Sequence, residues 1–269
     1  MPNEKWFLKR LYEEIDQPTL RFAFQGTINW MRGLALVSDK ELTDKKIKKF
    51  YKNVKKRKEN KKADLLVFEN IMIAMQNFHS IKIVNEKIEN PYDVVRMQIV
   101  SWYYTMYYAS SAMIAASSGN KQETHTSTAK TWQKELIVKG LVMTPFNLSL
   151  GTLVEKDVKK SMSTLRNGNK NDLNMYPSNQ SEAYGCLYSY LQGTASYKKW
   201  QTEEELQKSK EFKELGVSDF RKKVARELRD KRLEKGNVNF LVQAFRYRGK
   251  AHYRDSVFLS YGDSRSEEL

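Results

Sequence analysis

Residues 97–120 read MQIVSWYYTMYYASSAMIAASSGN and contain no charged side chain. A segment of this length could cross a bilayer. It also carries Gln98, four tyrosines and five serines, whose polar groups a lipid-facing helix would expose at a cost in free energy. No second segment of comparable length is available as another span. We therefore predict a helix buried inside a soluble protein, ended by the turn Ser118-Gly119-Asn120.

The rest of the sequence favours an all-α fold. Lysine, glutamate and leucine are plentiful, glycine and proline number 12 and 5, and strand-like alternation is scarce. Turn-forming residues predict a loop over 167–181, and the tyrosine-rich stretch 182–200 is left unassigned. The helices that periodicity and capping residues predict lie at 4–15, 20–37, 45–62, 63–84, 97–118, 128–142, 203–215, 219–235 and from about 237 onward.

The length is compatible with one large domain. We expect that domain to cover residues 1–269, with a helical extension at 1–90 and a loop-rich excursion at 145–200. The single cysteine, Cys186, fits a reducing cytosol, and the N-terminus has no long apolar core of the secretory type. A cytoplasmic protein without membrane attachment is therefore expected.

The net charge of +15 predicts a polyanionic partner, nucleic acid before an anionic membrane surface. Residues 45–62 hold eleven basic side chains and one acidic one, so the positive charge is clustered. Like charges at this density repel one another unless a partner neutralises them. The side chains expected to bind nucleic-acid phosphates are Lys48, Lys52, Lys55 and Lys56. The alternative is that residues 45–62 are a charged helix surrounded by solvent. Residues 221–232 form a second basic surface.

A second cationic segment, residues 245–255, reads FRYRGKAHYRD and includes one of three histidines. Imidazole can accept or donate a proton near neutral pH, and guanidinium can bind a phosphate with two hydrogen bonds. Arg248 and His252 are four residues apart and share a helical face, whereas Arg246 lies about 120° away unless Gly249 loosens the helix. Such a segment can cleave RNA without metal, or it can be the basic face of an amphipathic helix.

The sequence gives little support for metal, nucleotide-binding or cysteine chemistry. Three scattered histidines and one cysteine do not form a zinc motif, so no metal and no cofactor are expected. A phosphate-binding glycine loop of the Walker or dinucleotide type is absent from the sequence. Cys186 lies between a glycine and a leucine, which is typical of a packed residue and not of a nucleophile.

Two segments resemble the signature helices of the HEPN superfamily, particularly its small prokaryotic members. The first is the tyrosine-rich helix with its glycine turn and the following Lys/Thr-His pair. The second is the Arg-His segment, in which Arg246 and His252 are separated by five residues. The residues that carry the first resemblance are Tyr103, Tyr104, Met106, Tyr107, Tyr108, Ala109, Gly119, Lys121, Thr124 and His125.

The resemblance implies an antiparallel helical bundle and a metal-independent endoribonuclease, often a toxin or anti-phage effector. Arg246 and His252 would be catalytic, and RNA, with tRNA as one candidate, would contact Arg248, Lys250, Tyr253 and Arg254. A homodimer would bring two such segments together, with Phe240, Leu241 and Phe245 as apolar anchors. Some members of the superfamily bind without cutting, so the alternative is a non-catalytic protein that binds nucleic acid or a regulatory protein partner.

Overall fold

The structure of this chain, a computed structural model, describes residues 17–254 and confirms the predicted all-α fold. The helix expected over 4–15 lies outside these residues. The helices are α2 (Gln17–Glu41), α3 (Asp44–Tyr51), α4 (Lys61–Lys87), α5 (Val95–Ser118), α6 (His125–Thr131), α7 (Glu155–Leu165), α8 (Gln180–Lys208), α9 (Lys210–Lys213), α10 (Lys223–Glu234) and α11 (Phe240–Gly249).

Shorter elements connect these helices. A 3₁₀ turn, η1 (Pro91–Asp93), precedes α5, and the π-helical turns η2 (Trp132–Ile137) and η3 (Lys250–Arg254) extend α6 and α11. Two residues each from β1 (Ser149–Leu150) and β2 (Val238–Asn239) pair antiparallel. This short ladder joins the start of α11 to the middle of the chain.

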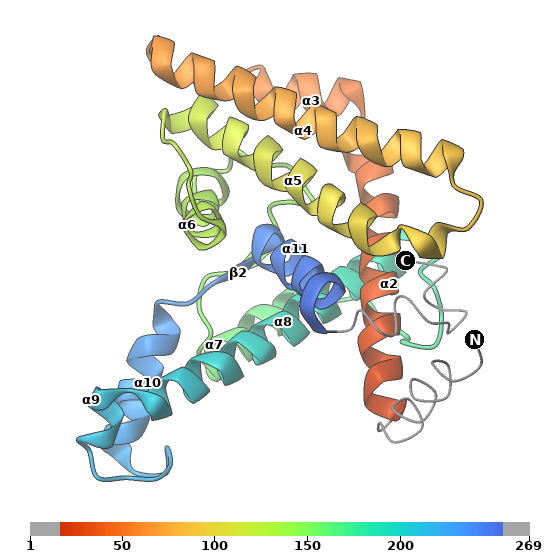
Figure 1. Ribbon diagram of the computed structural model, residues 1–269. Coiled ribbons are helices and arrows are strands. Elements are labelled where there is room, and N and C mark those ends of the chain that lie inside the picture. Colours follow the sequence, from red (N-terminus) through yellow and green to blue (C-terminus); the bar gives the residue numbers. More distant parts are fainter. Residues whose placement is uncertain (1–16, 255–269) are drawn as a thin grey trace, which may run out of the picture.

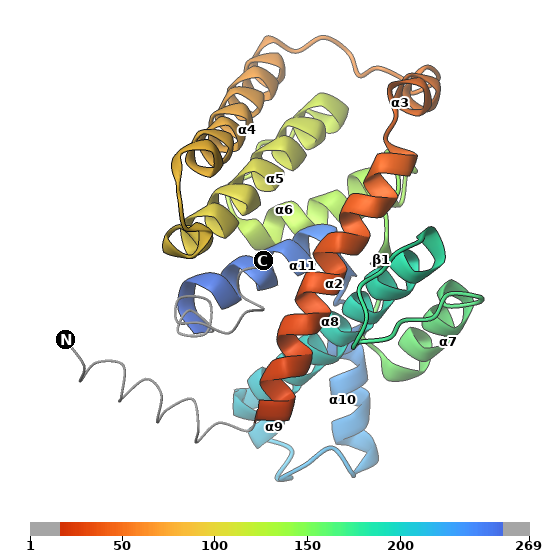
Figure 2. The ribbon, with the colours of Figure 1, turned by 90° about the vertical axis from the view of Figure 1, so that its right-hand side faces the viewer.

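The helices form two main pairs with α11 between them (Figures 1 and 2). In one pair α4 lies along α5, and in the other α2 packs on α8. α11 contacts α5, α6 and α8, and so bridges the two pairs. The segment with the predicted site is therefore placed at the centre of the fold.

The uncharged segment forms α5, as predicted. Its inner positions, including Ile99, Tyr103 and Ile114, are buried in the core. The helix ends at Gly119, whose φ of +78° lies in the left-handed region that glycine adopts without a Cβ clash. None of the helices within residues 17–254 is both long and apolar enough to span a membrane.

The prediction of one continuous helix over 45–62 was wrong. The helix expected over 45–62 ends at Tyr51, and an irregular segment follows before α4. The cations at 55–58 repel one another, and Val54 is the one apolar residue of the segment 52–60. Asn60 then starts α4, because its side chain accepts hydrogen bonds from the amides of Lys62 and Ala63.

The segment 145–200 is not a loop-rich excursion. It contains α7 and most of α8, and the irregular connection between them matches the loop predicted over 167–181. α8 begins at the cap Asn179 and continues through 203–208, where a separate helix had been expected. It is buried on several sides along its first half, so it lacks the one-sided apolar pattern that identifies a surface helix.

Two glycines of α8 allow a test of how tightly the connection between α7 and α8 packs against α8. A Cβ on Gly185 would lie 2.7 Å from the carbonyl carbon of Lys170 and closer still to its oxygen. Since backbone cannot move aside cheaply, we expect Gly185→Ala to lower the free energy of unfolding by about 1–3 kcal/mol.

The matched control is Gly193→Ala, where a Cβ would meet no atom within 4 Å. Here alanine should raise stability by about 0.5–1 kcal/mol, because it restricts the unfolded chain. Urea unfolding followed by circular dichroism measures both variants. Equal effects of the two substitutions would contradict the packing described for Gly185.

Candidate functional site

α11 is fixed at its start by Asn239. The side-chain oxygen of Asn239 accepts a hydrogen bond from the amide of Val242, and its Nδ2 donates to the carbonyl of Ala129 at 2.9 Å. Asn239 is fully buried, so these bonds anchor α11 to α6 as well as capping it. The helical backbone then continues through Gly249 and widens into η3.

Arg246 extends from α11 toward α8. Its Nη1 donates to Oγ1 of Thr194 at 3.2 Å, and its guanidinium lies 4.6 Å from the ring centroid of Tyr197. Its Nε is buried and has no hydrogen-bond partner among the described residues. The side chain is therefore held in one orientation with part of its donor capacity unused.

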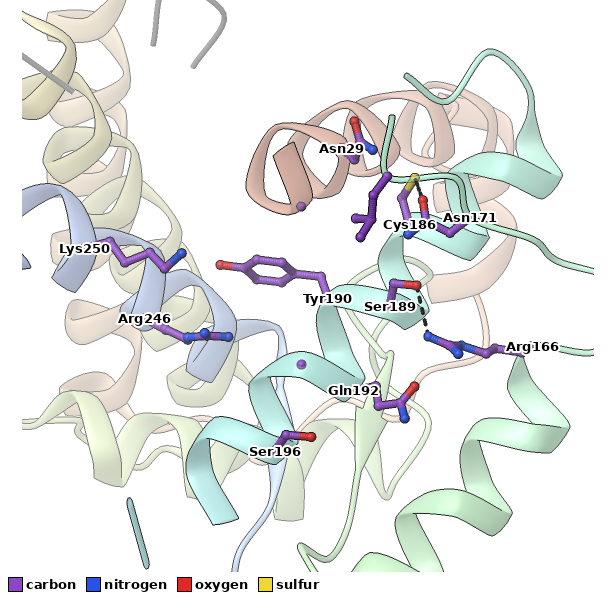
Figure 3. A pocket seen from close by; sticks show the side chains of 13 residues that line it. Asn29, Arg166, Asn171, Cys186, Ser189, Tyr190, Gln192, Ser196, Arg246 and Lys250 are labelled. Atoms are coloured by element: carbon purple, nitrogen blue, oxygen red, sulfur yellow. Dashed lines mark hydrogen bonds between the residues drawn. The ribbon is translucent and has the colours of Figure 1, made fainter. Parts of the chain in front are cut away.

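Arg246 and Lys250 line a pocket of about 420 Å³ between α2, α8, α11 and the connection after α7 (Figure 3). They approach Tyr190 from one side, and Arg166 lies on the opposite side with its Nη2 bonded to Oγ of Ser189 at 3.0 Å. None of the described lining residues is acidic. The other lining residues are Gly26, Asn29, Asn171, Leu173, Cys186, Gln192, Gly193 and Ser196.

The cysteine in this pocket is a packed residue, as predicted. Burial, and to a lesser degree the charge of Glu182, raises the pKa of the Cys186 thiol to about 11. Its sulfur lies 3.2 Å from Oδ1 of Asn171, to which the thiol donates. A thiol with this pKa is a poor nucleophile near neutral pH.

Arg248 faces the other way, toward α5. Its guanidinium lies 5.8 Å from the ring centroid of Tyr104. Nearby, Nδ1 of His125 forms a 2.7 Å hydrogen bond with the hydroxyl of Tyr103, and the imidazole stacks on Phe245 at 5.0 Å. Burial, together with the positive charge of Arg248, lowers the pKa of His125, so its neutral form is favoured.

His252 lies in η3 and is exposed. Arg96 of α5 holds its backbone: Nε donates to the carbonyl of Ala251 at 3.0 Å and Nη2 to that of His252 at 3.3 Å. His252 does not belong to the pocket that Arg246 and Lys250 line. The structure thus groups Arg246 with Lys250 on one side of α11 and Arg248 with His125 on the other.

The remaining predicted site residues lie elsewhere. Lys48, Lys52, Lys55 and Lys56 are all exposed, but they belong to the α3–α4 layer, which α5 separates from α11 (Figure 1). Tyr253 and Arg254 continue the backbone of η3, and their side chains lie outside the part that the structure describes.

Two of the anchors expected at a dimer interface are not available for it. Phe240 and Leu241 are 2% and 3% exposed, because they pack in the core of their own chain. Phe245 is half-buried against His125 and Tyr103. The prediction that Phe240 and Leu241 are apolar anchors of an interface around α11 was therefore wrong.

Sequence reasoning missed two features of the site. Arg166 follows α7 and carries no local signal, since only the fold brings it near α8. The pairing of His125 with Tyr103 was also missed, although both residues lie in the segment that resembles the HEPN signature. A tyrosine repeat on one helical face, followed by a histidine after a glycine turn, was the available signal.

Comparison of the chain with protein-family models, with curated proteins and with solved structures finds no match. Within residues 17–254, no group of three or more His, Cys, Asp or Glu side chains is arranged to hold a metal ion. The interpretation of the site therefore depends on its own geometry and charge.

The Tyr103–His125 pair generates a prediction about pH. Because the folded-state pKa of His125 is lowered, the unfolded chain binds more protons below about pH 6.5 than the folded chain does. The contribution of His125 to stability is thus complete above that pH and is lost as the pH falls. His125→Asn should reduce the decline in unfolding temperature between about pH 7 and pH 5.

The control for removing an imidazole is His79→Asn, on the exposed side of α4. Tyr103→Phe should in addition cost about 1 kcal/mol at pH 7.5, because it leaves the imidazole nitrogen without its hydroxyl partner. Parallel pH profiles for the His125 variant and the unmodified chain would contradict the role assigned to His125.

Proposed function

We propose that this chain is an RNA-binding protein of the HEPN type that cleaves RNA without metal, as a cytoplasmic toxin or phage-defence effector. One observation carries the proposal: Arg246 and Lys250 share a pocket that also holds Arg166 and has no acidic residue among its described lining. Three cations in one pocket favour a phosphate-bearing ligand. The net charge of +15 would attract a polyanion to it.

Arg246 suits this role because its orientation is already determined. Thr194 and the ring of Tyr197 hold the guanidinium, so little side-chain entropy remains to be lost on binding. Its buried Nε would donate a hydrogen bond to a phosphate oxygen. We assign the pocket to one backbone phosphate of a bound strand.

The cleavage step is assigned to His252 of η3 with Arg248, which lies four residues earlier at the end of α11. His252 would take the proton of the ribose 2′-hydroxyl, and the 2′-oxygen would attack phosphorus as the bond to the 5′-oxygen breaks. The imidazolium or a water molecule returns a proton to the 5′-oxygen. Arg248 would stabilise the negative charge that develops on the phosphoryl oxygens.

A second candidate function is RNA binding without cleavage. It is favoured by the separation of Arg246 and Lys250 from His252, which does not line their pocket. The expected apolar anchors for a dimer around α11 are also buried within the chain. The two functions predict different results for the same set of variants.

The test is an RNA-cleavage assay in EDTA with total RNA and tRNA as substrates. His252→Ala should lower kcat by a factor of about 10²–10⁴, with little change in binding, because only proton transfer is lost. Arg246→Ala should instead weaken RNA binding about tenfold or more, since each charge-assisted contact contributes roughly 1.5–3 kcal/mol.

Lys210→Ala is the control, because it removes one exposed cation that lies outside the pocket and outside both basic segments. Binding by the unmodified chain without any cleavage, unchanged by His252→Ala, would establish the non-catalytic function instead. No binding at low salt would exclude both, and a regulatory protein partner for the basic surfaces would then be sought.

The lysine-rich layer is tested separately. Replacing Lys48, Lys52, Lys55 and Lys56 by glutamine should weaken RNA binding and reduce the slope of log K against log salt by roughly one unit for each lost phosphate contact. All four side chains are exposed, so the fold should survive. The control replaces four other exposed lysines, Lys130, Lys134, Lys156 and Lys160. An equal slope in both quadruple variants would mean that residues 48–56 are a solvated face.

A further inference from the structure

The outer side of α4 carries a continuous row of exposed apolar side chains. The inner side packs on α5, where Ala63 and Ala74 are buried. The exposed residues are Leu65, Phe68, Ile71, Met72, Met75, Phe78 and Ile83, each between 40% and 67% exposed. Across residues 65–78 only one residue, Glu69, is charged. This is an unusual surface on a chain whose net charge is +15.

The size of the row matches one side of a protein interface. Seven large side chains, each about half exposed, leave on the order of 700 Å² of apolar surface, and a standard interface buries about 800 Å² per partner. Soluble monomers rarely leave an apolar patch of this size uncovered. The α4 surface, defined by these seven residues, therefore has the size and composition of an interaction surface.

The spacing of the row identifies the partner. Reversing residues 65–78 about the point between Ile71 and Met72 exchanges Leu65 with Phe78, Phe68 with Met75, and Ile71 with Met72. Every large exposed apolar side chain of this stretch is thus placed opposite another one. Glu69 falls opposite Ala74, so no two like charges meet within the stretch.

We propose that two copies of the chain dimerise through antiparallel α4 helices, with the two-fold axis between Ile71 and Met72. A two-fold interface uses the same patch on both copies, which is what a palindromic row supplies. Leu65, Phe68, Met72 and Met75 are spaced three, four and three residues apart, the pattern that lets facing helices interdigitate.

A neighbouring groove fits this arrangement. It measures about 800 Å³ and lies between α3, residues 54–59, α4 and α5, with Tyr51, Val54, Phe68, Met113 and Leu141 among its walls. Phe68 belongs both to the groove and to the α4 surface. The two-fold axis brings Met75 and Phe78 of the second copy to this end of α4, where they can enter the groove.

The α4 dimer leaves the Arg246 pocket untouched. α11 lies on the far side of α5 from α4 (Figure 1), so this two-fold axis leaves the Arg246 pocket of each copy facing away from the interface. Loss of the dimer should therefore leave RNA binding at the Arg246 pocket unchanged, whereas Lys55 and Lys56 line the groove beside the α4 surface and can respond to it. Failure of the RNA assays would say nothing about the dimer.

The first experiment measures the mass of the full chain by light scattering during gel filtration. The unmodified chain, 31.6 kDa, should have twice that mass at micromolar concentration. Phe68→Glu with Met72→Glu should return it to the monomer mass, because four carboxylates would be buried in the dimer. The control, Met97→Glu with Val138→Glu, makes the same change at two other exposed apolar residues and should leave the dimer intact.

A second experiment does not depend on a destabilising change. Met72→Cys should be crosslinked into a dimer by a short bis-maleimide reagent, whereas Met97→Cys should not, and the native Cys186 is buried. A monomer at 100 µM with no crosslink at position 72 would overturn the proposal. In that case, binding to lipid vesicles, or burial of the α4 methionines by another part of the chain, would identify a different occupant.

Discussion

The burial of Trp30 is the interaction on which the rest of the structure depends. Its indole is 1% exposed and contacts aromatic rings from three other helices. It stacks on Tyr190 of α8 at 4.5 Å and meets Trp102 of α5 and Tyr247 of α11 nearly perpendicular, at 6.1 and 5.9 Å. Because α2, α5, α8 and α11 all meet at this residue, the rotation of α11 about its axis is determined by the core.

That rotation decides what the basic segment can do. Tyr247 faces inward, is 2% exposed, and burial raises its pKa far above the ordinary value. Its two neighbours along the chain, Arg246 and Arg248, must then point to opposite sides of the helix, toward α8 and toward α5. Each guanidinium lies against tyrosine rings, which hold a cation without neutralising it. The two cationic sites therefore result from a single buried tyrosine between two arginines.

Much of the fold could be predicted from sequence, for reasons specific to each segment. α5 was predicted because an uncharged stretch of this length, ended by a glycine turn, is expected to form a buried helix. α4 was predicted because its apolar residues recur at helical spacing. The same logic failed for residues 52–60, where one apolar residue, Val54, could not overcome the repulsion among neighbouring cations. It also could not assign α8, whose first half is buried on several sides and so has no polar face. In the site, the chemistry of residues 245–255 was visible, but the faces that Arg246 and Arg248 occupy depend on Tyr247 and on partners far away in sequence.

The pairing of α2 with α8 has a consequence for synthesis of the chain. Asn29 donates a hydrogen bond to the carbonyl of Met175, a separation of 146 residues, and Trp30 stacks on a tyrosine even further along. α4 and α5, in contrast, are adjacent in sequence and can pair as soon as both have left the ribosome. α2 emerges before α8 and α11, so the parts of Trp30 that contact Tyr190 and Tyr247 stay uncovered until those helices have been made. During that interval the nascent chain exposes a tryptophan-bearing helix, which is the form of this protein most exposed to chaperones and to aggregation.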